Sequence, residues 1–178
     1  MKFKSFALVA TLAAIGATSV ATPAVAQEQF IPLLSYRTGA YAPNGIPWAN
    51  GKQDYVKYIN ANGGINGVKI AFEECETGYA TDKGVECYER LKGKGAAVFD
   101  PQATGITFAL TDKAPADKIP LITLGYGLAA SQDGGVFKWN FPLMGSYWTA
   151  ADILIQHLGT KEGGVDKLKG KKIALVYH

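Results

Sequence analysis

Thr104 and Gly105 are the residues best suited to bind a small molecule, because they stand at the start of a predicted helix, residues 104–116. A threonine hydroxyl and the free backbone N–H groups of a first helical turn together attract an anion such as a carboxylate. The same hydroxyl could instead cap its own helix and bind nothing else. The residue types leave both roles of Thr104 open.

A glycine-rich stretch, Gly125 to Ala130, has the spacing G-x-G-x-x-A of dinucleotide-binding loops. Those loops continue directly into a helix, which Ser131, Gly134 and Gly135 would interrupt here. The sequence also contains no G-x-S-x-G elbow, P-loop, H-E-x-x-H pair or Cys/His dyad. We therefore expect neither enzyme activity nor a bound cofactor.

Residues 1–26 have the features of a secretory signal peptide. Lys2 and Lys4 precede an uncharged stretch with an apolar run, which ends in the cleavage pattern Ala24-Val25-Ala26. Glycine, proline and hydroxyl residues make the run too polar for a membrane anchor, which needs about 20 predominantly apolar residues. We expect cleavage after Ala26, which would leave the mature chain free in the compartment to which it is exported.

The chain after residue 26 is nearly neutral, because losing the two lysines of the signal peptide lowers the formal net charge of +3 by two. A nucleic-acid partner would need basic residues gathered on one face, so none is expected. Cys75 and Cys87 are the two cysteines of the sequence, and an even number in an exported chain favours a disulfide between them. His157 and His178 lie far along the chain from both, so no metal site is expected.

Strands and helices alternate along the rest of the chain. Hydrophobic periodicity predicts the following order: strand 30–36, helix 48–61, strand 68–74, helix 82–92, strand 96–99, helix 104–116 and strand 119–124. In the first helix, Trp48, Tyr55 and Tyr58 recur at helical spacing and are expected to face the core. The last of these strands is a continuous apolar run, as in a parallel sheet covered on both faces. This order indicates an α/β fold with a doubly wound parallel sheet.

Three further elements are expected after the loop at 125–135. They are a short strand at 136–141, a helix that Ser146 caps and that ends near Leu158, and a buried strand at 172–177. A domain does not normally finish on an unpaired core strand, so we expect the chain to be the front part of a longer protein.

One stretch of sequence resembles a known family. Asn60-Ala61-Asn62-Gly63-Gly64-Ile65-Asn66-Gly67 is similar to the link between the first helix and the second strand in periplasmic binding proteins for branched-chain amino acids and related solutes. Thr38-Gly39-Ala40-Tyr41, Ile119-Pro120-Leu121-Ile122 and the paired lysines before Ile173-Ala174-Leu175-Val176 support the resemblance. It covers the whole chain after residue 26, about the first half of such a protein. It implies two Rossmann-like lobes, with residues 27–141 as the ligand-binding N-terminal lobe and residues 142–178 as the crossover and the start of the second lobe.

The resemblance also implies where a ligand would bind. In such proteins a hydroxyl and backbone amides of the loop after the third strand hold the ligand's carboxylate, and the matching residues here are Thr104 and Gly105. The loop after the fourth strand adds a backbone carbonyl and a hydroxyl, at positions similar to Gly125 and Gly127. Gly127 is a departure, because amino-acid binders usually have Thr or Ser there.

The first loop of such proteins places side chains over the ligand, which here are Tyr41 and Asn44. Tyr126 adds aromatic surface beside them, so an aromatic or flat apolar carboxylate would suit the site as well as a branched-chain or other hydrophobic amino acid.

The function implied is that of a carrier, which closes on a small organic acid by hinge bending and presents it to the permease subunits of an ABC transporter in the membrane. Two alternatives remain. A ligand-sensing regulator of the same fold fits the resemblance, but the cleavable signal argues against it. An exported α/β enzyme lacks a nucleophile, a base and metal ligands.

Overall fold

The computed structural model describes residues 28–176, and the predicted signal peptide lies outside them. Two parallel strands, β1 (Gln29–Ser35) and β2 (Ile70–Glu76), are paired along their full length, with Gln29 opposite Ile70 and Ser35 opposite Glu76. The predicted strands at 30–36 and 68–74 are therefore confirmed, with shifts of one and two residues.

A second parallel pair continues the sheet. β3 (Leu121–Thr123) lies beside β4 (Asn140–Pro142). Residues 97–99 connect the two pairs, because the Ala97 N–H donates to the Phe30 carbonyl at 3.3 Å and the Phe99 N–H donates to the Pro120 carbonyl at 3.0 Å. The order across the sheet is thus β2, β1, residues 97–99, β3 and β4, and the prediction of a doubly wound parallel sheet is confirmed.

The predicted strand at 96–99 takes its place in this order but forms only an isolated bridge, from Phe99 to Leu121. Its neighbour in the sheet explains why. The Ile122 N–H donates to the Phe99 carbonyl at 2.8 Å, but Pro120 has no N–H with which to continue the ladder toward residue 97.

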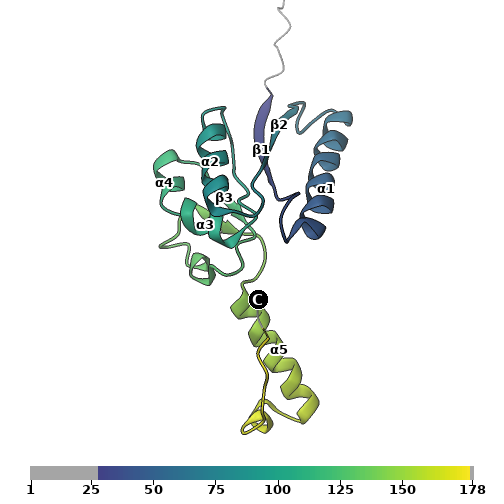
Figure 1. The fold of residues 1–178 in the computed structure, drawn as a ribbon, viewed down its shortest axis with the longest axis vertical. Helices are drawn as coiled ribbons and strands as arrows, with labels where there is room; N and C mark the ends of the chain where they lie inside the picture. Colours follow the sequence, from purple (N-terminus) through teal and green to yellow (C-terminus); the bar gives the residue numbers. More distant parts are fainter. Residues whose placement is uncertain (1–27, 177–178) are drawn as a thin grey trace, which may run out of the picture.

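Helices cover both faces of the sheet (Figure 1). Helix α1 (Ala42–Ala61) lies on one face, and α2 (Thr81–Lys92), α3 (Thr104–Leu110) and α4 (Lys113–Asp117) lie on the other. The predicted single helix at 104–116 is broken between α3 and α4. Pro115, which cannot donate to the carbonyl of residue 111, accounts for the break.

Helix α1 differs most from its prediction, because it begins at Ala42 rather than at residue 48. Pro43 fits in the first turn, where an N–H would have no partner within the helix. The predicted core face is also wrong: Trp48, Tyr55 and Tyr58 are exposed. The residues of α1 that are buried against the sheet are small or β-branched: Gly45, Ala49 and Val56.

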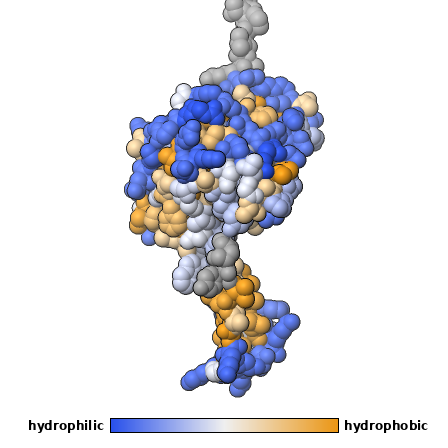
Figure 2. Space-filling view, viewed as in Figure 1, coloured by the Kyte–Doolittle hydropathy of each residue, from blue (hydrophilic) through white to orange (hydrophobic). Residues whose placement is uncertain are grey.

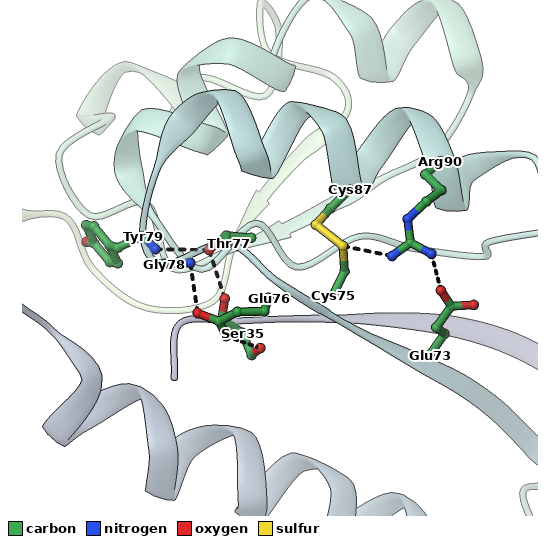
Figure 3. The surroundings of a disulfide bond; sticks show 9 residues. All are labelled: Ser35, Glu73, Cys75, Glu76, Thr77, Gly78, Tyr79, Cys87 and Arg90. Carbon is green, nitrogen blue, oxygen red and sulfur yellow. Dashed lines mark hydrogen bonds and ion pairs between the residues drawn. A yellow bond between two sulfur atoms is a disulfide. The ribbon is translucent and has the colours of Figure 1, made fainter. Parts of the chain in front are cut away.

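The main core fills the space between the sheet and α2 to α4. Tyr88 and Leu91 of α2 are fully buried there, and the Tyr88 ring packs on the Phe99 ring with centroids 4.7 Å apart. The predicted disulfide is confirmed, since Cys75 of β2 and Cys87 of α2 are bonded at the edge of this core (Figure 3). A disulfide that closes a loop of this size stabilises the folded state by about 3 kcal/mol in the chain-entropy model.

Helix α5 (Tyr147–Glu162) projects away from the sheet (Figure 1). Ser146 caps it as predicted, because its hydroxyl accepts from the Thr149 N–H at 3.4 Å. The helix continues past Leu158 to Glu162, and Gly163 follows as its C-cap with a φ of 85°, which suits glycine. The predicted strand at 136–141 is reduced to β4, since residues 136–139 form turns.

The prediction of a buried strand at 172–177 is wrong as far as the structure describes it. Residues 171–176 form no regular element, and Leu175 and Val176 are 83% and 91% exposed. A strand needs a partner backbone, and no described strand lies beside this segment.

Helix α1 approaches the end of β1 so closely that Gly45 has no room for a side chain. A Cβ there would lie 1.9 Å from the Tyr36 carbonyl oxygen. We expect Gly45→Ala to lower the free energy of unfolding by at least the roughly 1–3 kcal/mol of an overpacked core. Gly51→Ala, on the exposed side of the same helix with no atom within 4 Å of the new Cβ, should raise it by about 0.5–1 kcal/mol. Urea unfolding followed by circular dichroism measures both, and equal effects of the two variants would contradict this packing.

Candidate functional site

The loops that follow the strands meet around one hollow at the carboxyl edge of the sheet. This is the edge where open parallel α/β sheets bind their ligands. The hollow has a volume of about 290 Å³, and we call it the strand-end pocket. Its lining residues are Tyr36, Tyr41, Asn44, Trp48, Tyr79, Gln102, Thr104, Leu124, Tyr126 and Tyr147.

Four of the seven residues that the sequence indicated as ligand-binding line this pocket together: Tyr41, Asn44, Thr104 and Tyr126. They come from α1 and its preceding turn, from α3 and from the loop after β3, so the fold brings distant segments to one place. Asn44 lies in the first turn of α1 rather than in a loop.

The other three predicted residues, all glycines, do not line the pocket, but each leaves space for a neighbour. A Cβ on Gly105 would lie 2.5 Å from the Thr81 hydroxyl oxygen, and one on Gly125 would lie 2.7 Å from the Thr107 hydroxyl oxygen. A Cβ on Gly127 would lie 2.8 Å from the methyl carbon of Thr104. A larger residue at 127, as amino-acid binders have, would therefore displace Thr104.

Thr104 does not cap its helix. The N-cap of α3 is Ala103, and no side chain bonds to the first turn from that position. The Thr104 hydroxyl instead accepts a long hydrogen bond, 3.5 Å, from the Gly127 N–H of the neighbouring loop. The capping alternative is therefore wrong, and the hydroxyl lies between two loops at the edge of the strand-end pocket.

Aromatic rings form most of the pocket wall. The Tyr79 ring meets the Tyr36 ring edge-on at 5.1 Å between centroids and the Tyr41 ring at 4.4 Å, and Tyr126 lies 5.6 Å from Tyr147. Burial raises the pKa of the Tyr36 and Tyr79 hydroxyls, and for Tyr36 the nearby Asp100 carboxylate raises it further. These rings therefore stay neutral, and no charged side chain of the described residues lines the pocket.

Six lining residues are not among the seven predicted ligand-binding residues: Tyr36, Trp48, Tyr79, Gln102, Leu124 and Tyr147. Tyr36 and Leu124 directly follow β1 and β3, at the strand ends beyond which open parallel sheets bind their ligands. Trp48 was missed because its helical spacing pointed to the core.

A second hollow, of about 390 Å³, lies along the start of α5 and includes Met144, Tyr147 and Ile153. Figure 2 shows hydrophobic surface over α5, below the body of the molecule. This hollow is wide open and its lining is mostly apolar, whereas polar side chains from several loops converge on the strand-end pocket. We therefore take the strand-end pocket as the candidate site.

The carboxylate of Glu76 holds together the two loops that carry Tyr41 and Tyr79. It accepts from the Ser35 hydroxyl at 2.8 Å and from the Gly78 N–H at 2.9 Å (Figure 3), and also from the Arg37 N–H at 2.8 Å. Partial burial opposes ionisation of this carboxyl, but these hydrogen bonds and one from the Thr38 hydroxyl outweigh it and lower its pKa to about 2.

Comparison with known proteins identifies the family to which the chain belongs. Residues 28–178 match a family described as periplasmic binding protein. The chain belongs to the periplasmic binding protein family. The resemblance seen in the sequence is thus confirmed. A comparison with curated proteins found no match.

Several solved structures share the fold of this binding-protein lobe. A protein of the Pseudomonas fluorescens group, described as an ABC transporter permease, is 49% identical over 81% of this chain and 36% of its own, with a TM-score of 0.72. A fatty acid ABC transporter substrate-binding protein from Thermomonospora curvata is 22% identical over 76% of this chain and 34% of its own, with a TM-score of 0.65.

The branched-chain amino acid transporter substrate-binding protein LivJ from Streptococcus pneumoniae, in complex with isoleucine, is 24% identical over 67% of this chain and 34% of its own, with a TM-score of 0.57. The chain therefore spans about a third of the length of these structures, less than the half that the resemblance implied. Within residues 28–176, no helix is long and apolar enough to cross a membrane.

The lowered pKa of Glu76 predicts how acid affects the binding-protein lobe. The folded-state pKa lies below the ordinary value of 4.5, so the ionised carboxylate stabilises the fold above pH 4.5, and this contribution is lost as the pH falls toward 2. We expect Glu76→Gln to unfold more readily than wild type at pH 7 and to lose less stability between pH 4.5 and 2. Urea unfolding at pH 7, 4.5 and 2.5 measures this. Glu86→Gln, an exposed site on α2, serves as the control, and a shared acid profile would contradict the role of Glu76.

Proposed function

We propose that this chain contains the ligand-binding lobe of an extracytoplasmic solute-binding protein of an ABC uptake transporter, and that it binds a small organic acid in the strand-end pocket. The observation that carries the proposal is the meeting of Tyr41, Asn44, Thr104 and Tyr126 in one hollow at the carboxyl edge of the sheet. In this family such a hollow would serve as half of a two-lobed site.

The carboxylate of the ligand would bind next to Thr104. The Thr104 hydroxyl is a neutral donor, and the first N–H groups of α3, including that of Gly105, have no acceptor within the helix. Since no charged side chain within residues 28–176 lines the pocket, this lobe would hold the carboxylate with neutral donors alone.

The body of the ligand would lie against the tyrosine rings. Ring faces favour flat apolar groups and add about 0.5–1.5 kcal/mol per aromatic pair beyond the burial of area. An aromatic carboxylate or a hydrophobic amino acid both meet this requirement. The isoleucine and fatty acid named for two structures of this fold lie in the same range of chemistry.

The division of the chain follows from the same proposal. Residues 27–141 would form the N-terminal lobe, and residues 142–178 would cross to a second lobe and begin it. The exposed apolar side chains of α5, such as Trp148 and Ile153, would then lie against that lobe. Closure of the two lobes around the ligand would give the form that the permease subunits recognise.

Export is the first part of the proposal that can be tested. We expect the mature protein to begin at Gln27, because Ala24-Val25-Ala26 completes a signal peptide. N-terminal sequencing of protein recovered from the periplasmic fraction measures this. A protein that still begins at Met1 would contradict the localisation.

The role of Thr104 tests the site. We expect Thr104→Ala to weaken binding of an acid ligand by about tenfold to a hundredfold, the effect of losing a hydrogen bond worth 1.5–3 kcal/mol to a charged group. Thr104→Ser keeps the hydroxyl and should bind nearly as wild type does. Titration calorimetry on the complete two-lobed protein, with L-isoleucine and benzoate as probes, measures the affinities. Affinities that Thr104→Ala leaves unchanged would contradict the carboxylate site.

A further inference from the structure

We infer that Gln102 is a ligand-binding residue that selects acids carrying a hydroxyl or N–H donor. The inference rests on the proposed function, because Gln102 lines the same strand-end pocket. Gln102 is not among the seven predicted ligand-binding residues; it lies between Pro101 and Ala103 just after the sheet segment 97–99.

The side-chain oxygen of Gln102 is a buried acceptor that no group in the structure satisfies. Gln102 is 7% exposed, and among the described residues its Oε1 is the single buried side-chain polar atom without a hydrogen-bond partner. Buried polar groups in proteins nearly always have a partner, so an orphaned one needs an explanation. Because Gln102 lines the pocket, a ligand bound there would lie beside this amide and could supply the donor.

The neighbouring Asp100 fixes which end of the amide is offered. The Gln102 Nε2 donates to Asp100 Oδ2 at 3.2 Å, and the Gln102 backbone N–H donates to Asp100 Oδ1 at 3.2 Å. Lys52 Nζ, 3.2 Å from Asp100 Oδ2, forms an ion pair with the same carboxylate. A carboxylate only accepts hydrogen bonds, so the NH₂ group of Gln102 must face it and the oxygen must face elsewhere. The ligand group that meets this oxygen must therefore be a donor.

The backbone at Gln102 is also strained. Its φ of 61° lies in the left-handed region, where glycine is favoured and a long side chain is uncommon. Residues held in such conformations concentrate at binding and catalytic sites. At Gln102 the strain coincides with an unsatisfied acceptor on a residue that lines the candidate site, and the two observations thus point to the same residue.

The residues that line the pocket around this acceptor indicate the class of ligand. Tyrosine rings favour a flat apolar body, and Gln102 requires a donor on it. The donor could be a hydroxyl on the body of the acid or the ammonium of an amino acid, since both give the same hydrogen bond. Sites built to bond a polar group discriminate strongly against ligands that lack it, because the protein group is then left unpaired.

Three acids that share the same carbon skeleton distinguish a hydroxyl donor from an ammonium donor: 3-phenylpropionate, 3-(4-hydroxyphenyl)propionate and L-phenylalanine. The first has no donor, the second has a hydroxyl and the third has an ammonium. We expect the complete protein to bind at least one donor-bearing acid about tenfold or more tightly than 3-phenylpropionate. Titration calorimetry measures the ratio, and the preferred acid identifies the donor.

The preference should depend on Gln102. Methionine has a similar length to glutamine but no strong acceptor. Gln102→Met should therefore reduce the preference to less than about threefold, because it weakens binding of the donor-bearing acid. Gln102→Asn keeps the amide but shortens it, and asparagine tolerates the left-handed backbone; it too should lose the preference. Gln29→Met, an exposed site at the opposite end of β1, is the control and should keep it. Circular dichroism establishes that each variant is folded.

Two results would overturn the role of Gln102. One is a preference for donor-bearing acids that survives in both Gln102 variants, and the other is equal or tighter binding of 3-phenylpropionate by the wild-type protein. Tight binding of 3-phenylpropionate alone would still support the proposed function, so the inference and the function can fail separately.

Discussion

All strands of this lobe run in the same direction, and this constraint places their carboxyl ends along one edge of the sheet. The segments that leave this edge begin near Tyr36, Thr77, Asp100 and Leu124, which are far apart in the sequence. Each contributes to the same hollow because the sheet brings their starting points together. The pocket is therefore a consequence of topology, and no single motif in the chain forms it.

Close approach at two glycines brings neighbouring segments together beside the hollow. Helix α1 meets the end of β1 at Gly45, and the loop after β3 meets Thr104 at Gly127, and both contacts would be too short if either glycine carried a side chain. Glu76 holds the ends of β1 and β2 together. Its single carboxylate accepts from Ser35 and Arg37 at the end of β1 and from Gly78 just after β2. These contacts hold the loops close together, and such preorganisation would lower the entropy lost if a ligand binds in the pocket.

Much of this architecture could be predicted from the sequence, because local signals and the fold agree. Apolar runs gave β1 and β2 to within two residues, and Ser146 identified the start of α5. Where the predictions failed, a neighbour decided the outcome. Pro120 interrupts the ladder at 97–99, and the sheet selects the small face of α1 rather than its aromatic face. The site was predicted only in part. Thr104 and Tyr126 could be found from the residue types of their loops, whereas the Gln102 oxygen lacks a partner because the NH₂ end of the same amide faces Asp100.

The lining of the strand-end pocket by neutral groups also determines how binding depends on the solution. Attraction between full charges falls as dissolved ions screen it, over a distance of about 10 Å at 0.1 M salt. Hydroxyls, amides and ring faces inside a hollow are affected far less. The share of the affinity that this lobe would supply should then be nearly constant from dilute to saline surroundings.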